Sequence, residues 1–370
     1  SFALGARLPI AGAELAVGVD GRLATHDAVI TNPNNAAFRI DNFVDVERDL
    51  LGLYAEWRTA TGAGEWEFGV RYNTVSTDAG EVSASGMMGM MAAAAGDLAD
   101  RFNAADRSLD FGNVDVVAGY RRSLSPDLAA VVEAGSRTRA PSYQELYLWL
   151  PLQATGGLAD GRTYIGNLDL DAERSNEINA GLDWSAGRLS LSPRVYYRRV
   201  DDYIQGVPAT DMTADMIASM MSGAPALRFD NVDAELYGFD MAWRYGITEN
   251  LAVDGVASLV RGKRRDTDDY LYRLTPDNVT VGLDYRRQRY TLRGEVVAYR
   301  RQDRVAAYNG ERETAGYALV NLEFAWSPLP ALTLEAAVEN LLDREYRDHL
   351  TGLNRAGGSD IPVAERLPGA

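Results

Sequence analysis

Methionine is unevenly distributed along this sequence. Eight of the nine methionines lie in two segments, and they are Met87, Met88, Met90 and Met91 in the first and Met212, Met216, Met220 and Met221 in the second. Because thioether sulfur is a soft donor that suits Cu(I), the two segments together are a candidate copper site. Methionine also fills irregular apolar gaps without binding a metal, so packing, or contact with an apolar ligand, is the alternative.

The spacing of these residues predicts helices. Met212, Met216 and Met220 recur every four residues, which places them on one face of a short helix. The alanine run 92–95 predicts the core face of a second helix that continues toward Phe102. A shared copper site requires two or three sulfurs to converge, so we expect a sulfur of the first segment to approach one of the second.

Aromatic side chains form the second candidate site. Tyr143, Tyr147, Trp149 and Tyr164 lie with Gln153 in one stretch without a strand pattern. Tyrosine and tryptophan supply large contact areas at low cost in side-chain entropy, so this group is a candidate ligand-binding site. The alternative is that these aromatic side chains only hold their own loop together.

Composition and motifs exclude several classes of function. The chain has no cysteine and only two histidines, His26 and His349, which removes thiolate chemistry and disfavours a catalytic triad or a histidine-based zinc site. There is no Gly-x-Ser-x-Gly elbow and no phosphate-binding glycine loop, so no residue is assigned a catalytic role. The net charge of −16 argues against nucleic acid as a partner, because phosphate contacts require a basic surface.

Strands must position these groups, because apolar and polar side chains alternate with a period of two over long stretches. The alternation assigns each strand an outer, apolar face and an inner, polar face. The side chains predicted to point outward are Leu292, Val296, Trp243, Leu332, Leu334, Ala336 and Val338. Those predicted to point inward are Arg194, Arg198, Arg293, Glu295, Thr333, Glu335 and Glu339.

About fourteen strands are predicted, many longer than the roughly 5 or 6 residues that are usual in soluble sheets. Their connections alternate between short and long. Short turns are predicted near 9–13, 60–65, 124–127, 185–188, 246–249, 286–289 and 326–330. Long loops are predicted near 31–45, 79–109, 140–172, 207–226, 262–271 and 306–314. In an antiparallel meander this order puts all turns at one end and all long loops, with both candidate sites, at the other.

This asymmetry is typical of outer-membrane barrels, which have short periplasmic turns and long extracellular loops. Five of the six tryptophans lie near short turns, as an interfacial aromatic belt requires, and they are Trp57, Trp66, Trp184, Trp243 and Trp326. No run approaches the roughly 18 apolar residues of a membrane-spanning helix. The sequence therefore predicts an all-β fold, an antiparallel up-and-down transmembrane β-barrel fragment.

Three segments resemble the barrel of TonB-dependent receptors. Residues 338–346 (VENLLDREY) look like the penultimate strand of that family. Residues 139–147 (RAPSYQELY) and 166–181 (GNLDLDAERSNEINAG) resemble a strand-to-loop passage and the opening of the next strand. The order and spacing of the three segments extend the resemblance over residues 1–370.

The resemblance implies an outer-membrane transport receptor that takes up a siderophore, cobalamin or a metal such as copper, with TonB energy coupling. The implied partners are outer-membrane lipid, the TonB complex and the solute, and the implied localisation is the outer membrane. Residues 1–30 do not resemble the plug domain of the family, and residues 365–370 precede its last strand, so both are expected to be absent. Because family barrels have about 22 strands, early strands are expected to be absent as well. The alternatives are a passive porin-like or adhesion barrel and, more remotely, a soluble all-β binding protein.

Overall fold

A computed structural model of the chain describes residues 1–370 except 156–157, 159, 355–359, 363–364 and 370. Sixteen strands of the described residues form one sheet, and all but two short loop strands lie on one path in which each strand pairs with its neighbours in the chain. The strands on this path are β1 (Phe2–Ile10), β2 (Ala13–Asn32), β3 (Asn35–Thr61), β4 (Gly64–Asp78), β6 (Leu109–Ser125), β7 (Leu128–Arg139), β9 (Glu173–Ala186), β10 (Leu189–Pro208), β11 (Leu227–Gly246), β12 (Leu251–Arg264), β13 (Asn278–Arg287), β14 (Tyr290–Tyr299), β15 (Tyr317–Leu329) and β16 (Leu332–Val338). The predicted meander of about fourteen strands is confirmed.

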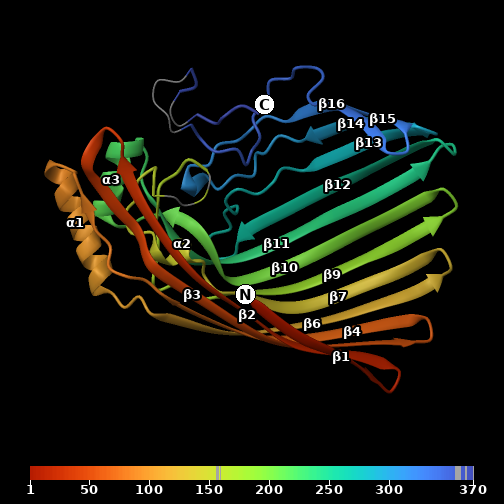
Figure 1. The fold of residues 1–370 in the computed structure, drawn as a ribbon, viewed down its shortest axis with the longest axis horizontal. Helices are drawn as coiled ribbons and strands as arrows, with labels where there is room; N and C mark the ends of the chain where they lie inside the picture. The colour runs from red at the N-terminus through yellow and green to blue at the C-terminus, as the bar shows by residue number, and fades with distance from the viewer. Residues whose placement is uncertain (156–157, 159, 355–359, 363–364, 370) are drawn as a thin grey trace.

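The seven predicted short turns are confirmed, and they lie together at one end of the sheet (Figure 1). Most of them contain only two residues between the paired strands. Gly62 and Gly187 occupy two of these turns with φ of +58° and +59°, a conformation that favours glycine. The long loops lie at the opposite end of the sheet, as the alternation predicts (Figure 1).

Four of the long loops contain short elements. The loop after β4 carries β5 (Ala84–Ser85) and α1 (Gly89–Ala104), and the loop after β7 carries α2 (Tyr143–Tyr147) and β8 (Tyr164–Ile165). The loops after β10 and β14 carry α3 (Met212–Ser222) and the 3₁₀ helix η1 (Ala307–Asn309). Among the described helices, none is long and apolar enough to cross a membrane.

The predicted long loop at 31–45 is wrong. β2 and β3 continue through this range and pair as far as Asn32 and Asn35, so that residues 33–34 form the turn. Register shifts near His26 and Ala28 interrupt the ladder, and Asp45 has a φ of +46°. Such bulges break the two-residue alternation from which strands are predicted.

The predicted faces of the strands are confirmed where the ladder extends. Arg293 pairs in register with Glu323 and Asp284, and it forms ion pairs with carboxylates of one face. Leu292, Val296 and Leu334 lie on the other face and are 46%, 42% and 49% exposed. Trp243 shares that outer face through its register with Gly255, and Glu335 shares the face of Arg293 through its pairing with Ala325. Glu339 lies beyond the end of β16.

The outer face near the turns carries the expected aromatic side chains. Trp66 packs against Tyr120 with 4.1 Å between ring centroids and stacks on Phe68, which also contacts Trp57. Trp57 and Trp66 are 37% and 39% exposed, a large exposure for this residue type. An exposed aromatic group at one level of an apolar wall is the arrangement of an interfacial belt.

One pairing departs from the antiparallel order. β8 pairs in parallel with the first two residues of β11, over Tyr164↔Leu227 and Ile165↔Arg228. β8 belongs to the long loop after β7 and lies off the path of the meander. The path itself contains no crossover between its described strands, so the predicted architecture stands.

Candidate solute-binding site at the loop end of the sheet

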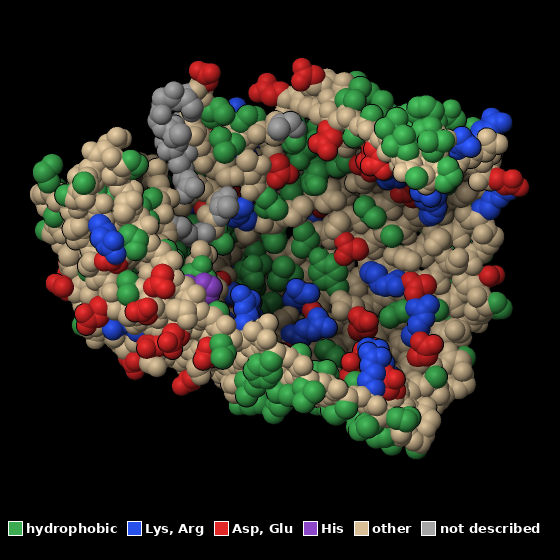
Figure 2. All heavy atoms as spheres, in the orientation of Figure 1, with side chains coloured by type: hydrophobic (Ala, Val, Ile, Leu, Met, Phe, Trp, Pro, Cys, Tyr) green, Lys and Arg blue, Asp and Glu red, His purple; other side chains and the backbone are tan. Residues whose placement is uncertain are grey.

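The inner face of the sheet is a wall of paired charges. Arg293 bridges Asp254 and Asp284 at 3.0 and 3.1 Å, and Asp183 lies between Arg121 and Arg194. Charged side chains of both signs line the hollow of the molecule (Figure 2). Each such pair contributes little stability while it is exposed to water. The wall is therefore a polar surface that suits a hydrated interior, with the candidate sites above it.

Helix α1 contains a run of alanines, and it packs through a face of small side chains. Ala94, Ala95, Leu98 and Ala99 are buried at helical spacing, and small side chains allow close approach to the loops beneath. The predicted helix over the alanine run toward Phe102 is confirmed. Its N-terminal end carries the first group of methionines.

Helix α3 has capping signals at both ends. The Asp211 carboxylate accepts hydrogen bonds from the backbone N–H groups of Thr213 and Ala214, which satisfies two donors of the first turn. Gly223 ends the helix with a φ of +71°, the usual left-handed closure. The buried residues are Ala214, Ile217 and Ala218, so the packing face lies beside the methionine stripe and not on it.

The two methionine helices are joined by a charged contact. Arg101 of α1 donates to Asp211 at 2.6 Å and also pairs with Asp97 at 3.0 Å, while the Thr213 hydroxyl donates to Asp97 at 3.3 Å. Burial of the Asp211 carboxyl favours its neutral form, but the hydrogen bonds from Arg101 and the helix amides outweigh burial and hold the pKa of Asp211 below its usual value. The contact therefore depends on an ionised aspartate.

The methionines separate into two groups. Met87, Met91 and Met216 are partly buried against one apolar cluster that includes Leu98 and Ile217. The others face solvent, with Met88 and Met212 each 87% exposed, and the remaining three are Met90, Met220 and Met221. The expected location at the loop end is confirmed, and one methionine of the second segment lies on the same cluster as two of the first. A copper site at these sulfurs stays a prediction.

The four aromatic residues predicted to bind a ligand lie largely inside the loop core. Tyr147, Trp149 and Tyr164 are 1%, 4% and 0% exposed. Tyr147 donates to the Arg107 carbonyl at 2.8 Å, and Trp149 donates to the Asp41 carbonyl at 3.1 Å. These contacts favour the alternative, in which the aromatic side chains hold the loops together.

Tyr143 differs from the other three because it is only partly buried. It stacks on His26 at 4.4 Å and meets Phe43 edge-on at 5.1 Å. The helix that carries it, α2, begins with a capping box of Ser142 and Glu145. Ligand contact at this aromatic group therefore remains a prediction that Tyr143 supports better than its neighbours do.

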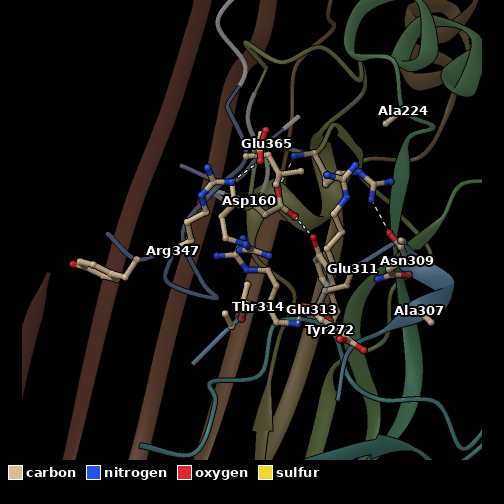
Figure 3. Close-up of a pocket in the computed structure, with 18 of the residues that line it drawn as sticks. Asp160, Ala224, Tyr272, Ala307, Asn309, Glu311, Glu313, Thr314, Arg347 and Glu365 are labelled. Atoms are coloured by element: carbon tan, nitrogen blue, oxygen red, sulfur yellow. Dashed lines mark hydrogen bonds and ion pairs between the residues drawn. The ribbon is translucent and has the colours of Figure 1, made fainter. Parts of the chain in front are cut away.

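A pocket that the sequence did not predict lies among five loop segments. Its volume is about 950 Å³, and its wall comes from the loops after β7, β10, β12 and β14 and from the segment after β16. Asp160 accepts hydrogen bonds from Tyr164 and from Tyr272, the second at 2.8 Å (Figure 3). Burial raises the pKa of Tyr272, so its hydroxyl stays protonated and donates. The lining residues are scattered along the sequence and form no motif. The one signal in the sequence is that several of these loops contain arginine.

A buried pair supports the floor of this pocket. The His349 ring contacts the Glu311 carboxylate through Nε2 at 3.1 Å and the Thr314 hydroxyl through Nδ1 at 2.9 Å. The His349 and Glu311 side chains are 0% and 2% exposed. Glu311 also accepts hydrogen bonds from the backbone N–H groups of Arg273 and Ala306. These bonds fix three loops relative to one another.

Known structures share this fold. The copper transporter OprC matches with a TM-score of 0.79 and 19% identity, over 99% of this chain and 54% of that one. The FrpB iron transporter from Neisseria meningitidis matches with a TM-score of 0.62 and 15% identity, over 99% and 52%. The ferric yersiniabactin uptake receptor FyuA from Yersinia pestis matches with 0.61 and 12%, over 93% and 49%. The chain thus spans about half the length of these structures.

Sequence comparison gives the family directly. No curated protein sequence matches the chain. The family model described as TonB dependent receptor-like, beta-barrel matches residues 2–341, which is most of the sequence. Together with the meander, the polar inner wall and the long-loop end, this match shows that the chain belongs to the TonB-dependent receptor β-barrel family, whose members are transporters of the outer membrane and not enzymes.

Proposed function

We propose that this chain belongs to a transporter that captures a scarce solute at the long-loop end of its barrel and takes it up with TonB energy coupling. The observation that carries the proposal is that both methionine helices and a pocket of about 950 Å³ gather at one end of a polar-walled sheet. The TonB complex would act through a part of the protein that precedes residue 1. Outer-membrane lipid would cover the outer face.

Energy coupling separates this function from a passive or adhesive barrel. A hydrated polar wall would serve diffusion equally well, so geometry alone does not distinguish them. We expect uptake by cells that carry the complete protein to stop when TonB is deleted. Uptake that continues unchanged in the deletion strain would contradict the proposal and favour the passive barrel.

Copper is the cargo that the chain's own residues favour. Met87, Met91 and Met216 come from two loops more than one hundred residues apart and pack against the same cluster. Their three thioether sulfurs are soft donors, which Cu(I) prefers as ligands. A chain of the same fold, the copper transporter OprC, is named for this cargo.

The test is Cu(I) titration of the complete protein with matched variants. Met87→Leu, Met91→Leu and Met216→Leu together remove three clustered sulfurs and keep apolar volume. Met88→Leu, Met90→Leu and Met212→Leu together remove three sulfurs that are exposed to solvent. We expect the first triple variant to weaken Cu(I) binding at least about ten-fold, because each lost ligand removes part of the coordination, and the second to bind as wild type. Equal affinity for Cu(I) in the wild type and both variants would mean that these methionines only pack against their neighbours.

A further inference from the structure

The pocket among the loops is rich in arginine. Six arginines line it, and they are Arg162, Arg273, Arg312, Arg344, Arg347 and Arg366. This concentration contrasts with the whole chain, whose net charge is −16. The pocket also borders the ends of the α3 loop, at Pro208 and Pro225. It is therefore a basic site beside, and separate from, the methionine helices.

Three of these guanidinium groups bond to backbone carbonyls rather than to carboxylates. Arg162 donates to the carbonyls of Asn309 at 2.7 Å and Pro225 at 3.2 Å, and Arg273 donates to the Leu350 carbonyl at 2.7 Å. Arg366 donates to the carbonyls of His349 and Thr351. Carbonyl groups orient a guanidinium but do not neutralise it, and none of these three groups forms an ion pair with a residue that the structure describes.

The guanidinium groups of two further arginines lack a partner in the described part of the chain. The side chains of Arg312 and Arg344 are exposed and form no hydrogen bond or ion pair with a residue that the structure describes, whereas the backbone of Arg344 bonds to the Asn340 side chain. Arg347 is different, because it pairs with Glu365 at 2.5 Å (Figure 3). Burial lowers the pKa of Arg366, and it outweighs the nearby carboxylates of Glu311 and Asp348, which favour the charged form.

Five carboxylates also line the pocket, and four of them already accept hydrogen bonds or form ion pairs. Asp160 accepts from two tyrosine hydroxyls, and Glu311 accepts from His349 and two backbone amides. Glu313 pairs with Arg301, which does not line the pocket. Glu365 pairs with Arg347, and Glu345 is exposed at the pocket wall. The site thus combines six guanidinium groups with five carboxylates, four of which are already engaged.

We propose that this pocket binds a small carboxylate-bearing solute. The planar guanidinium fork matches carboxylate geometry and can donate two parallel hydrogen bonds. A volume of about 950 Å³ lies within the range of ordinary small-molecule sites. Carboxylates of the solute pair with Arg162, Arg273 and Arg366, which form no ion pair with a described residue, while Arg312 and Arg344 contact it from the exposed side. The inference goes beyond copper capture and depends on neither metal nor TonB.

The test is calorimetric titration of the complete protein in neutral detergent with citrate, without copper and at low salt. Arg312→Gln combined with Arg344→Gln removes the two charges that support no described contact, so the fold is preserved. The matched control combines Arg286→Gln with Arg287→Gln, which makes the same change of charge on exposed residues at the turn end of β13. This control separates a local site from the effect of net charge.

We expect wild type and control to bind citrate with the same affinity. We expect the Arg312/Arg344 variant to bind at least about ten-fold more weakly, because a charge-assisted hydrogen bond contributes about that factor. An increase in salt should weaken binding by wild type, since partly exposed charges are screened. Absence of citrate binding, or equal affinities in the variant and the wild type, would overturn the inference. Neither result would bear on copper binding by the methionines.

Discussion

Asp211 shows how one side chain can serve both a helix and its neighbour. It caps α3 through two backbone N–H groups and pairs with Arg101 of α1. Asp211 thus links the two helices that carry the methionines, in addition to the apolar packing between them. The arrangement of the two methionine helices can therefore be changed by a substitution that removes no sulfur.

Replacement of Asp211 by Ala should loosen the contact between α1 and α3. Loss of a helix cap costs about 1 kcal/mol and loss of a charged hydrogen bond about 1.5 to 3 kcal/mol. Because the chain has no cysteine, single cysteines introduced at the exposed Met90 and Met221 can carry spin labels. We expect a broader interlabel distance distribution in the variant. Asp169→Ala, which removes a carboxylate that is 93% exposed, should leave the distribution unchanged.

The same labels test the pH dependence of the contact. Asp211 has a lowered pKa in the folded protein, so its contribution is fully present above the unfolded value of 3.8 and is lost as the pH falls through the folded value. The label distance should therefore stay constant from neutral pH to about pH 4 and broaden only in stronger acid. Broadening between pH 7 and 5 would contradict the assignment of this contact to Asp211.

At the scale of the elements, the alternation of apolar and polar side chains predicted the strands, because neighbouring residues of a strand point to opposite faces. The seven turns followed from it, whereas the helix over the alanine run was predicted from the run itself. Bulges in β2 and β3 defeated the same rule, because one extra residue reverses the face of every residue after it. The pocket could not be predicted, because Arg162 and Arg366 are brought together by loops far apart in sequence.

Two valines of similar exposure test the assignment of the faces. Val296 on β14 lies on the outer face and is 42% exposed, whereas Val256 on β12 lies on the inner face beside Asp254 and is 50% exposed. Arginine on a lipid-exposed strand face costs up to about 2 to 4 kcal/mol, but in a hydrated interior it costs little. We expect Val296→Arg to lower the free energy of unfolding of the complete protein in liposomes, and Val256→Arg to leave it nearly unchanged. Equal losses would mean that the faces are wrongly assigned.

At the scale of the whole molecule, the described strands form an open sheet. β1 pairs only with β2 and β16 only with β15, so two edges present free backbone N–H and C=O groups. The outer face between these edges is apolar, and the inner face is charged. An open sheet of this kind is poorly suited to a bilayer, in which backbone groups find no water to satisfy them.

Residues 1–370 expressed alone should therefore associate through these edges. Free strand edges are templates for pairing with another chain, and membrane barrels avoid them by closure. We expect the isolated segment, refolded in detergent, to elute as mixed oligomers in size-exclusion chromatography with light scattering, whereas the complete protein elutes as one species. Glu335→Pro, in the middle of β16, should reduce association, because the N–H of Glu335 points away from β15, so proline removes a donor of the free edge and leaves the pairing with β15 in place. A monodisperse monomer of the isolated segment would contradict the prediction and would imply that β1 and β16 find each other in solution.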